Sequence, residues 1–207
     1  MNVYVALGDS FTAGNGLDAE RRWADLLARD LRADHPGLEY FNLARDGADS
    51  RAVLEQVPAA VAAQPDLITL VCGANDVILS LRPDIPSFAG RLELIIDRLR
   101  RSIPGVTILA ATYPEGWSFE GAGPRTAARI RSGMRELNRA IFRVTASRGV
   151  ACLDVIDHPG IDDPENFEPD GLHPSALGHR QAAAEFRRAV AAQLPPRTRR
   201  RRTKLWK

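Results

Sequence analysis

The chain has 207 residues, 44% of them hydrophobic and 26% charged, which is typical of one soluble globular domain with a sizeable core. No apolar run approaches the roughly 20 residues needed to cross a bilayer. The first apolar run, residues 3–7, is short and has no basic residue before it, unlike a signal peptide. We therefore expect neither a membrane span nor secretion, and we expect a cytoplasmic location.

The net charge of +2 conceals an uneven distribution. Residues 197–207 contain seven basic residues and no acidic one, whereas residues 1–196 contain 21 basic and 26 acidic residues. We expect residues 1–196 to form a single domain and residues 197–207 to be a basic, disordered tail. Such a tail can also bind nucleic acid or anionic lipid, but nothing else in the chain has a nucleic-acid-binding pattern. No nucleic-acid partner is therefore expected.

Along the chain, short apolar runs alternate with longer segments in which apolar residues recur at helical spacing. The runs predict strands at residues 3–7, 39–43, 67–72, 106–111 and 150–155. The longer segments predict helices at residues 21–31, 50–63, 88–101, 126–147 and 175–194. Apolar strands separated by helices indicate a parallel sheet covered on both faces. The predicted fold is α/β: a three-layer α/β/α domain of flavodoxin-like type with a five-stranded parallel sheet.

Polar segments follow several of the predicted strands. Gly8-Asp9-Ser10 follows the first, Asp46-Gly47 the second and Gly73-Ala74-Asn75-Asp76 the third, and Asp170–His173 lies on the loop after the fifth. Ligands in such folds bind beyond the carboxyl ends of the strands. We therefore expect four segments that are distant in sequence to meet at one edge of the sheet.

A serine near one end of the chain and a histidine near the other fit nucleophilic catalysis. A serine hydroxyl is a poor nucleophile and needs a base within hydrogen-bond reach, which His173 can provide for Ser10. Asp170, three positions before the histidine, can hold the imidazole tautomer and stabilise the imidazolium. Structural roles are also open: Ser10 as a helix N-cap, Asn75-Asp76 as a turn pair, and His173 as a surface residue before a proline.

The same segments resemble the sequence blocks of the SGNH (GDSL) hydrolase family of serine esterases and acylhydrolases. The first block matches Gly8-Asp9-Ser10-Phe11-Thr12-Ala13-Gly14, with phenylalanine where leucine is common. The second block requires a glycine after the second strand, and Gly47 supplies it after Ala44-Arg45-Asp46. The third block, Gly-x-Asn-Asp, matches Gly73–Asp76, and the fifth, Asp-x-x-His, matches Asp170–His173. The resemblance runs in order from Gly8 to the closing helix.

The resemblance implies a flavodoxin-like fold and hydrolysis through an acyl-enzyme on Ser10, with His173 as general base oriented by Asp170. It also implies an oxyanion hole made by the backbone N–H groups of Ser10 and Gly47 and the side-chain amide of Asn75. Each such donor typically lowers the barrier by about 3 kcal/mol. The expected partner is a small-molecule ester, either a short-chain acyl ester or a thioester, and deacetylation of a carbohydrate is the alternative. No cofactor and no metal are expected.

Two other functions fit parts of the pattern. A metal-dependent phosphoesterase could use Asp9, Asp76, Asp170 and His173 as ligands to a divalent cation, although it leaves Ser10 without a role. A non-catalytic flavodoxin-like binding domain would share the fold alone. Covalent labelling by a fluorophosphonate, and its dependence on Ser10, separates serine hydrolysis from both.

Two loops, residues 77–86 and 112–124, follow the third and fourth predicted strands and should border the site. The second loop carries Tyr113, Trp117 and Phe119, which either line an acyl or sugar pocket or anchor the loop by packing. Glycines at positions 116, 121 and 123 would permit this loop to move over the site as a lid.

Overall fold

The structure is a computed structural model that describes residues 1–115 and 122–193. Trp117, Phe119 and the tail 197–207 lie outside the described residues, so what the sequence predicts for them stays a prediction. None of the helices in the described part of the chain combines the length and apolar character needed to cross a bilayer.

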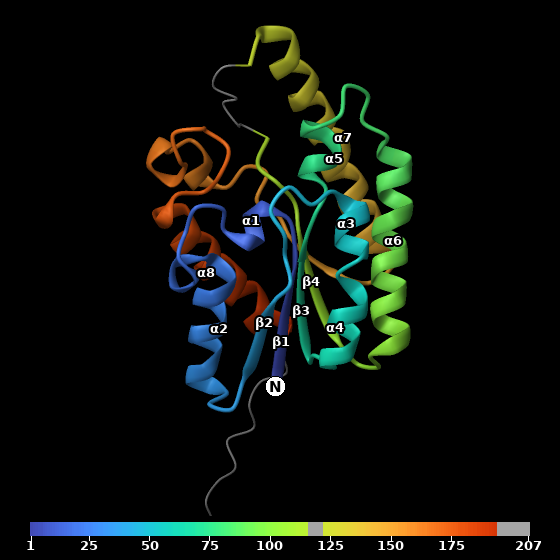
Figure 1. Ribbon diagram of the computed structural model, residues 1–207, viewed down its shortest axis with the longest axis vertical. Coiled ribbons are helices and arrows are strands. Elements are labelled where there is room, and N and C mark those ends of the chain that lie inside the picture. Colours follow the sequence, from blue (N-terminus) through green and yellow to red (C-terminus); the bar gives the residue numbers. More distant parts are fainter. Residues whose placement is uncertain (116–121, 194–207) are drawn as a thin grey trace, which may run out of the picture.

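Five parallel strands form one sheet at the centre of the molecule (Figure 1). The strands are β1 (Val3–Gly8), β2 (Glu39–Asn42), β3 (Leu67–Val71), β4 (Thr107–Ala111) and β5 (Ala151–Leu153). Their order across the sheet is β2-β1-β3-β4-β5, and every neighbouring pair is parallel. The five-stranded parallel sheet of flavodoxin-like type is thus confirmed. Its order reverses between β1 and β3, which is the switch point where ligands bind in open α/β sheets.

Helices cover both faces of the sheet (Figure 1). The first face carries α1 (Ser10–Ala13), α2 (Trp23–Asp34) and α8 (Ala176–Gln193). The other carries α3 (Ser50–Leu54), α4 (Val57–Ala63), α5 (Ala74–Ile78), α6 (Ile85–Ser102) and α7 (Pro124–Ser147). Single turns of 3-10 helix lie at Ala19–Arg21, Pro159–Ile161 and Pro164–Asn166. The result is the predicted three-layer α/β/α arrangement.

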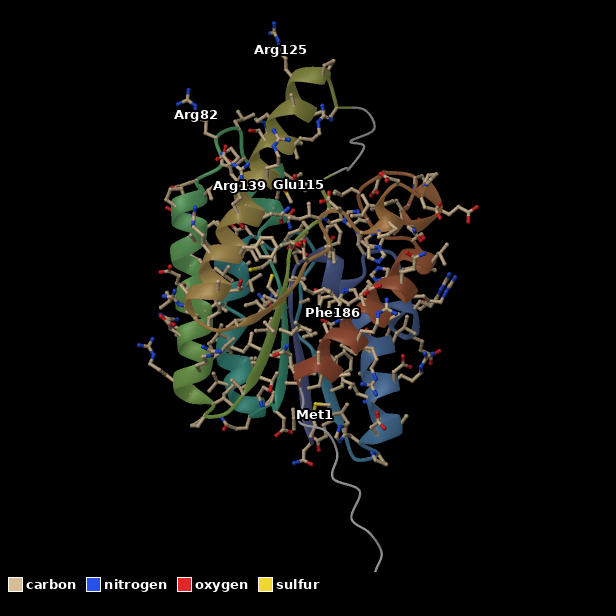
Figure 2. All side chains as sticks on the ribbon, turned by 180° about the vertical axis from the view of Figure 1, so that it is seen from behind. Met1, Arg82, Glu115, Arg125, Arg139 and Phe186 are labelled. Carbon is tan, nitrogen blue, oxygen red and sulfur yellow. The ribbon has the colours of Figure 1, made fainter. Side chains whose placement is uncertain are left out.

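The core lies between the sheet and each helix layer, where the predicted apolar stripes are buried. On α6 the buried stripe includes Phe88, Leu92, Ile95, Ile96 and Leu99, and on α7 it includes Ile130, Met134, Leu137, Ile141 and Val144. On the other face, Trp23 of α2 stacks on Phe186 of α8 with ring centroids 4.0 Å apart. Figure 2 shows Phe186 inside this layer, whereas Arg125 of α7 and Arg82 of the loop between α5 and α6 extend outward on the other side.

The single helix expected at residues 50–63 is instead two helices, α3 and α4, and that prediction is wrong. The reason is Pro58, which lies in the first turn of α4. Proline has no N–H to donate to the carbonyl four residues earlier, and its ring clashes with that carbonyl. The carbonyl belongs to Leu54, where α3 ends. Proline is tolerated in a first helical turn, so the chain restarts a helix at Val57.

The last strand is also shorter than the expected 150–155. The Asp154 side chain accepts a hydrogen bond from the Ile156 N–H at 3.0 Å, and the Val155 N–H donates to the Thr112 hydroxyl at 2.9 Å. These side-chain acceptors replace the strand ladder, and aspartate commonly forms turns of this kind. β5 therefore ends at Leu153, and a long irregular segment leads from it to α8.

Candidate active site

The turn after β1 presents Ser10 at the carboxyl edge of the sheet. Asp9 is the N-cap of α1, and its side chain accepts a hydrogen bond from the Phe11 N–H, so Ser10 is the first helical residue and not the cap. Gly8 has φ +156°, and a Cβ there would lie 2.3 Å from the Val71 carbonyl oxygen. Only glycine permits this close approach of β1 to β3. The Gln56 amide also hydrogen-bonds both the N–H and the carbonyl of Gly8, at 3.0 and 2.8 Å.

The structure brings Ser10, His173 and Asp170 together in one hydrogen-bonded chain. His173 Nε2 lies 3.1 Å from Ser10 Oγ, and His173 Nδ1 lies 2.6 Å from Asp170 Oδ2. Because a carboxylate only accepts hydrogen bonds, the proton of the neutral imidazole resides on Nδ1. Nε2 then accepts from the serine hydroxyl. This is the orientation in which a histidine can remove the serine proton.

Asp170 is held as an ionised acceptor by its own turn. Its Oδ1 accepts hydrogen bonds from the N–H groups of Leu172 and His173, both at 2.9 Å. Burial alone would raise the pKa of Asp170, but the hydrogen bonds from the His173 side chain and from these two N–H groups outweigh it and lower the pKa. The carboxylate is therefore charged and faces the imidazole at neutral pH.

Asp9, directly before the nucleophile, is a second carboxyl group at the site and is fully buried. The Tyr113 hydroxyl donates to its Oδ2 at 2.6 Å. Burial raises the pKa of Asp9 to about 7, although hydrogen bonds from Tyr113 and Phe11 and the attraction of His173 oppose the increase. Tyr113 is itself buried, so of the two roles open to it the described structure favours that of a loop anchor.

The two other expected oxyanion donors, Gly47 and Asn75, line one pocket of about 320 Å³. Asn75 Nδ2 donates one hydrogen to the Ala48 carbonyl at 3.0 Å, which leaves its second hydrogen for another acceptor. The loop before Gly47 is joined to the nucleophile turn, because the Arg45 N–H donates to the Gly8 carbonyl at 3.2 Å. Gly47 has φ +70°, and no atom lies within 4 Å of where its Cβ would be. Its backbone conformation, more than crowding, requires glycine there.

The four side chains of the metal-site alternative do not converge. Asp9 bonds to Tyr113, Asp170 bonds to His173, and Asp76 accepts hydrogen bonds from Ser50 and Arg91. Across residues 1–115 and 122–193, no group of three or more histidine, cysteine, aspartate or glutamate side chains is arranged to hold a metal ion. The metal-dependent alternative therefore has no support from the described residues.

Several residues that shape the site have no signature in the sequence. Ser50 and Arg91 lie on helices after Gly47, and Gln56 lies in the turn between α3 and α4; nothing in their spacing distinguishes them from ordinary residues of these segments. Their contacts with Gly8 and Asp76 depend on how α3, α4 and α6 pack against the sheet edge. Only the polar character of Ser50 and Gln56 among apolar neighbours could have suggested a role.

His179 lies outside the site and has a structural role. Its Nδ1 accepts a hydrogen bond from the Trp23 N–H at 3.1 Å, so it satisfies a donor at the start of α2. Burial lowers its pKa to about 4, and the nearby charge of Arg22 acts in the same direction. His179 is therefore neutral at physiological pH.

An apolar cavity of about 130 Å³ lies beside the nucleophile turn. Its lining includes Phe11 and Pro174, the chain neighbours of Ser10 and His173, together with Tyr113 and Phe167. The Phe11 ring also lies near the imidazole, with ring centroids 6.0 Å apart. The site therefore combines a serine hydrogen-bonded to a histidine, candidate oxyanion donors and a small apolar space.

A flavodoxin-like α/β/α domain that carries a Ser–His–Asp contact at the carboxyl edge of its sheet is the arrangement of an SGNH hydrolase. The sequence agrees with the fold: the model of the GDSL-like lipase/acylhydrolase family matches residues 6–181. The chain belongs to this family, and it is an ester-bond hydrolase.

The known proteins that the chain resembles include an esterase and a lipase/acylhydrolase. Esterase TesA of Pseudomonas aeruginosa is 23% identical over 173 residues, which cover 83% of this chain and 79% of the esterase. A crystal structure of TesA has a TM-score of 0.74 at 21% identity and covers 93% of this chain and 99% of that one. A lipase/acylhydrolase from Enterococcus faecalis has a TM-score of 0.76 at 23% identity, covering 95% and 99% of the two chains. These structures share the fold.

Proposed function

We propose that the protein is a serine esterase that cleaves short-chain acyl esters or thioesters through an acyl-enzyme on Ser10. His173 is the general base, and Asp170 orients it. The observation that carries this proposal is the continuous contact from Asp170 Oδ2 through His173 to Ser10 Oγ, with distances of 2.6 and 3.1 Å. These three groups supply the nucleophile, the proton acceptor and the group that stabilises the imidazolium.

In acylation, Ser10 Oγ attacks the ester carbonyl carbon while His173 Nε2 takes the hydroxyl proton. The carbonyl oxygen becomes an oxyanion, and the N–H groups of Ser10 and Gly47 and the amide of Asn75 donate hydrogen bonds to it. The imidazolium then passes its proton to the leaving oxygen or sulfur as the bond to the carbonyl carbon breaks. The alcohol or thiol leaves, and the acyl group stays on Ser10.

Deacylation repeats these steps with water as the nucleophile. His173 takes a proton from water, the hydroxide attacks the acyl-enzyme, and the same donors stabilise the second oxyanion. Its collapse releases a carboxylic acid and returns the proton to Ser10 Oγ. No step needs a group beyond the side chains and backbone named here.

The preference for short acyl groups rests on the size of the apolar cavity that Phe11 and Pro174, the chain neighbours of Ser10 and His173, help to line. A cavity of about 130 Å³ accommodates a few carbon atoms, not a long acyl chain. On a series of p-nitrophenyl esters we expect kcat/KM to be highest for acetate and butyrate and to fall with longer chains. A steady rise toward long chains would contradict a small pocket. A matched thioester and an acetylated sugar in the same series test the other two substrate classes.

The nucleophile is tested with a fluorophosphonate probe on the wild type and on Ser10→Ala. We expect the wild type to be labelled covalently and to hydrolyse p-nitrophenyl acetate, and the variant to do neither. Ser102→Ala, an exposed serine at the end of α6, is the matched control and should be indistinguishable from wild type. Hydrolysis that survives Ser10→Ala and is abolished by EDTA would overturn the proposal in favour of metal-dependent chemistry.

A further inference from the structure

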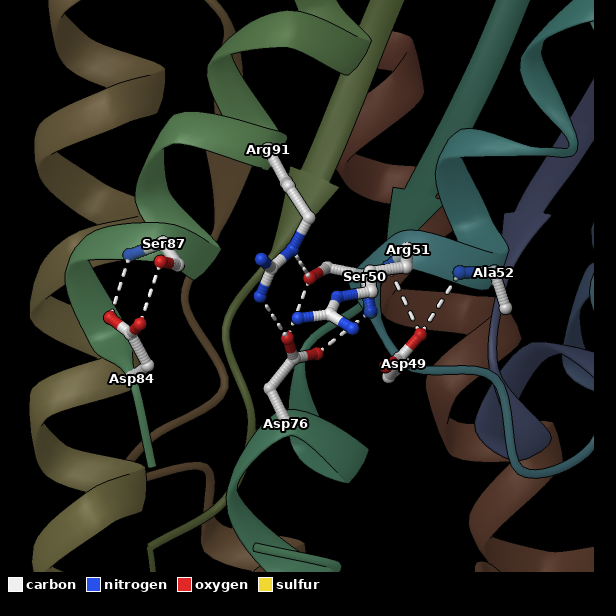
Figure 3. Close-up of polar contacts among 8 residues, drawn as sticks. All are labelled: Asp49, Ser50, Arg51, Ala52, Asp76, Asp84, Ser87 and Arg91. Atoms are coloured by element: carbon white, nitrogen blue, oxygen red, sulfur yellow. Dashed lines mark hydrogen bonds and ion pairs between the residues drawn. The ribbon is translucent and has the colours of Figure 1, made fainter. Parts of the chain in front are cut away.

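A charged network joins three helices next to the candidate oxyanion donors (Figure 3). The Asp76 carboxylate on α5 accepts hydrogen bonds from the N–H of Ser50 at 2.8 Å and from its hydroxyl at 2.6 Å. Arg91 on α6 completes the network. Its Nε donates to the Ser50 hydroxyl oxygen at 2.6 Å, and its Nη2 donates to Asp76 Oδ1 at 3.0 Å.

The network links the two chain segments that carry the oxyanion donors. Asp76 directly follows Asn75, and Ser50 begins α3, three residues after Gly47. The hydrogen bond from Asn75 Nδ2 to the Ala48 carbonyl joins the same two segments closer to the donors. Because Gly47 and Asn75 come from different strand ends, their spacing depends on these contacts and not on any single stretch of backbone.

The charges in the network are largely removed from water. The side chains of Asp76 and Arg91 are 5% and 20% exposed, and Ser50 is fully buried. A carboxylate in this position, next to the place where an oxyanion forms, repels the developing negative charge, and screening by solvent is weak there. The Arg91 guanidinium, 3.0 Å from Asp76 Oδ1, compensates that charge. The same contact therefore supplies both geometry and charge balance.

Resting on the serine hydrolysis proposed above, we propose that Arg91 is a positioning residue of the oxyanion hole. Through Ser50 and Asp76 it fixes the spacing of the Gly47 and Asn75 donors, and it cancels the Asp76 charge that would otherwise oppose oxyanion formation. Arg91 acts through these neighbours and does not contact the substrate. If Arg91 only stabilised the fold, its replacement would change the unfolding temperature but would not lower kcat relative to KM.

The test is Arg91→Gln, with Arg98→Gln, an exposed arginine on the same helix, as the matched control. We expect Arg91→Gln to lower kcat on p-nitrophenyl acetate at least about 10-fold with KM changed less than about 3-fold, because the lost stabilisation is specific to the transition state. Labelling by the fluorophosphonate should slow in parallel. Arg98→Gln should match wild type in both measurements.

A charge-neutral double variant separates electrostatics from folding. Arg91→Gln with Asp76→Asn removes the uncompensated carboxylate, and the side-chain oxygen of the introduced asparagine can still accept from the Ser50 N–H. We expect the double variant to recover at least about 3-fold in kcat over Arg91→Gln alone, since the two charges are directly coupled. If Arg91→Gln does not fold, Arg91→Lys, which keeps the charge but cannot make both contacts of the guanidinium, takes its place. Its kcat should fall at least about 3-fold with KM little changed, and a kcat equal to that of Arg98→Gln would overturn the positioning role.

The outcomes distinguish the role of Arg91 from the serine hydrolysis on which that role rests. A wild type that is labelled and active, with Arg91→Gln as active as Arg98→Gln, overturns the role of Arg91 and leaves Ser10 catalysis intact. A double variant no better than Arg91→Gln overturns the charge compensation. A wild type that is neither labelled nor active on any ester overturns serine hydrolysis, and the role of Arg91 with it.

Discussion

Asp9 is an unusual neighbour for a nucleophile, because it is a fully buried carboxyl group whose pKa is raised to about 7 by that burial. The folded protein binds its proton more tightly than the unfolded chain, in which the pKa is near 3.8. The folded state therefore carries more protons between these two values, and its stability falls as the pH rises through that range. A pKa change of this size corresponds to about 4 kcal/mol at most.

Asp9→Asn should remove this pH dependence. Asparagine keeps an oxygen that accepts from the Phe11 N–H, and it carries no charge to bury. We expect the unfolding temperature of the variant, relative to wild type, to be higher at pH 8 than at pH 5. Differential scanning calorimetry at both values checks this, since other titrating groups contribute equally to both proteins. If the unfolding temperatures of the variant and the wild type differ by the same amount at pH 5 and pH 8, Asp9 is ionised in the folded wild type at both pH values.

Asp170 has the opposite environment, since hydrogen bonds lower its pKa and it is half-exposed. Asp170→Asn keeps the shape of the side chain but removes the charge that stabilises the imidazolium. We expect kcat to fall by about 100-fold or more with KM little changed, because the charge matters most in the transition state. Steady-state kinetics measures this, with Asp157→Asn on the same irregular segment as the control. A fall of less than about 3-fold would show that another acceptor orients His173.

The turn between β3 and α5 sets where Asn75 lies, and Gly73 is its tightest point. A Cβ at Gly73, which has φ +124°, would lie 2.6 Å from the Phe88 ring and 2.9 Å from Leu137. This side of the turn packs against α6 and α7. The position of Asn75 is thus fixed by the packing of Gly73 against α6 and α7, as well as by the hydrogen bond from Asn75 Nδ2 to the Ala48 carbonyl.

Gly73→Ala should therefore lower both stability and activity. We expect a loss of about 3 kcal/mol in the free energy of unfolding, from overpacking combined with the strained φ. Gly90→Ala is the contrasting control, because Gly90 is exposed in the middle of α6 with no atom within 4 Å of its Cβ position. It should gain about 0.5–1 kcal/mol. Urea denaturation measures the free energy of unfolding of both variants. Equal changes in Gly73→Ala and Gly90→Ala would contradict the crowding at Gly73.

Long helices and central strands could be predicted from the sequence, whereas short helices could not. α6 and α7 have apolar stripes over several turns, and β1, β3 and β4 are short runs of mainly apolar residues. α1 and α5 have four and five residues, too few for a periodic pattern. They exist because the chain turns onto the sheet edge at a glycine, Gly8 at the end of β1 and Gly73 two residues after β3. Pro58 marks the break between α3 and α4 in the sequence, although the apolar residues around it continue the helical pattern.

The residues of the candidate site also divide into those that the sequence indicates and those that only the tertiary structure reveals. Ser10, Asp170 and His173 lie in motifs whose spacing is local, so the sequence alone indicated them, and the structure places them within hydrogen-bond distance. Arg91 and Gln56 act across the fold, and their contacts depend on how the helices pack. No spacing along the chain records such a contact. Their positions therefore became visible only with the tertiary structure.

The sheet order places Ser10 at the centre of the molecule. β1 and β3 are adjacent, and the connections that leave them run to opposite faces, so a gap opens at their carboxyl ends. Ser10 follows one of these strands and Asn75 the other. The fold thus provides the site before any particular side chain does, which is why one architecture can serve esterases with different substrates.

The seven basic residues and the absence of acidic ones in residues 197–207 predict a disordered tail that adds nothing to the core. We therefore expect a chain that ends after Pro196 to keep the unfolding temperature within about 2 °C, a change of less than about 1 kcal/mol for a domain of this size. Its kcat/KM on p-nitrophenyl acetate should equal that of the full chain. Calorimetry and steady-state kinetics on both forms measure this. A large loss in either would assign the basic residues 197–207 a part in folding or catalysis.

Ser10 and the proposed base His173 are held with unequal firmness. Ser10 follows a strand in the middle of the sheet, but Asp170 and His173 lie on a segment that joins no strand of it. The isolated bridge between Phe167 and Pro174 and the hydrogen bond from the Ser175 N–H to the Asn166 carbonyl tie this segment to itself and not to the sheet. Segments with few ladder hydrogen bonds open locally at a lower free energy than the core. Warming should therefore swing the base away from the serine while the sheet stays folded. Heat would then switch the enzyme off reversibly, well before it unfolds it.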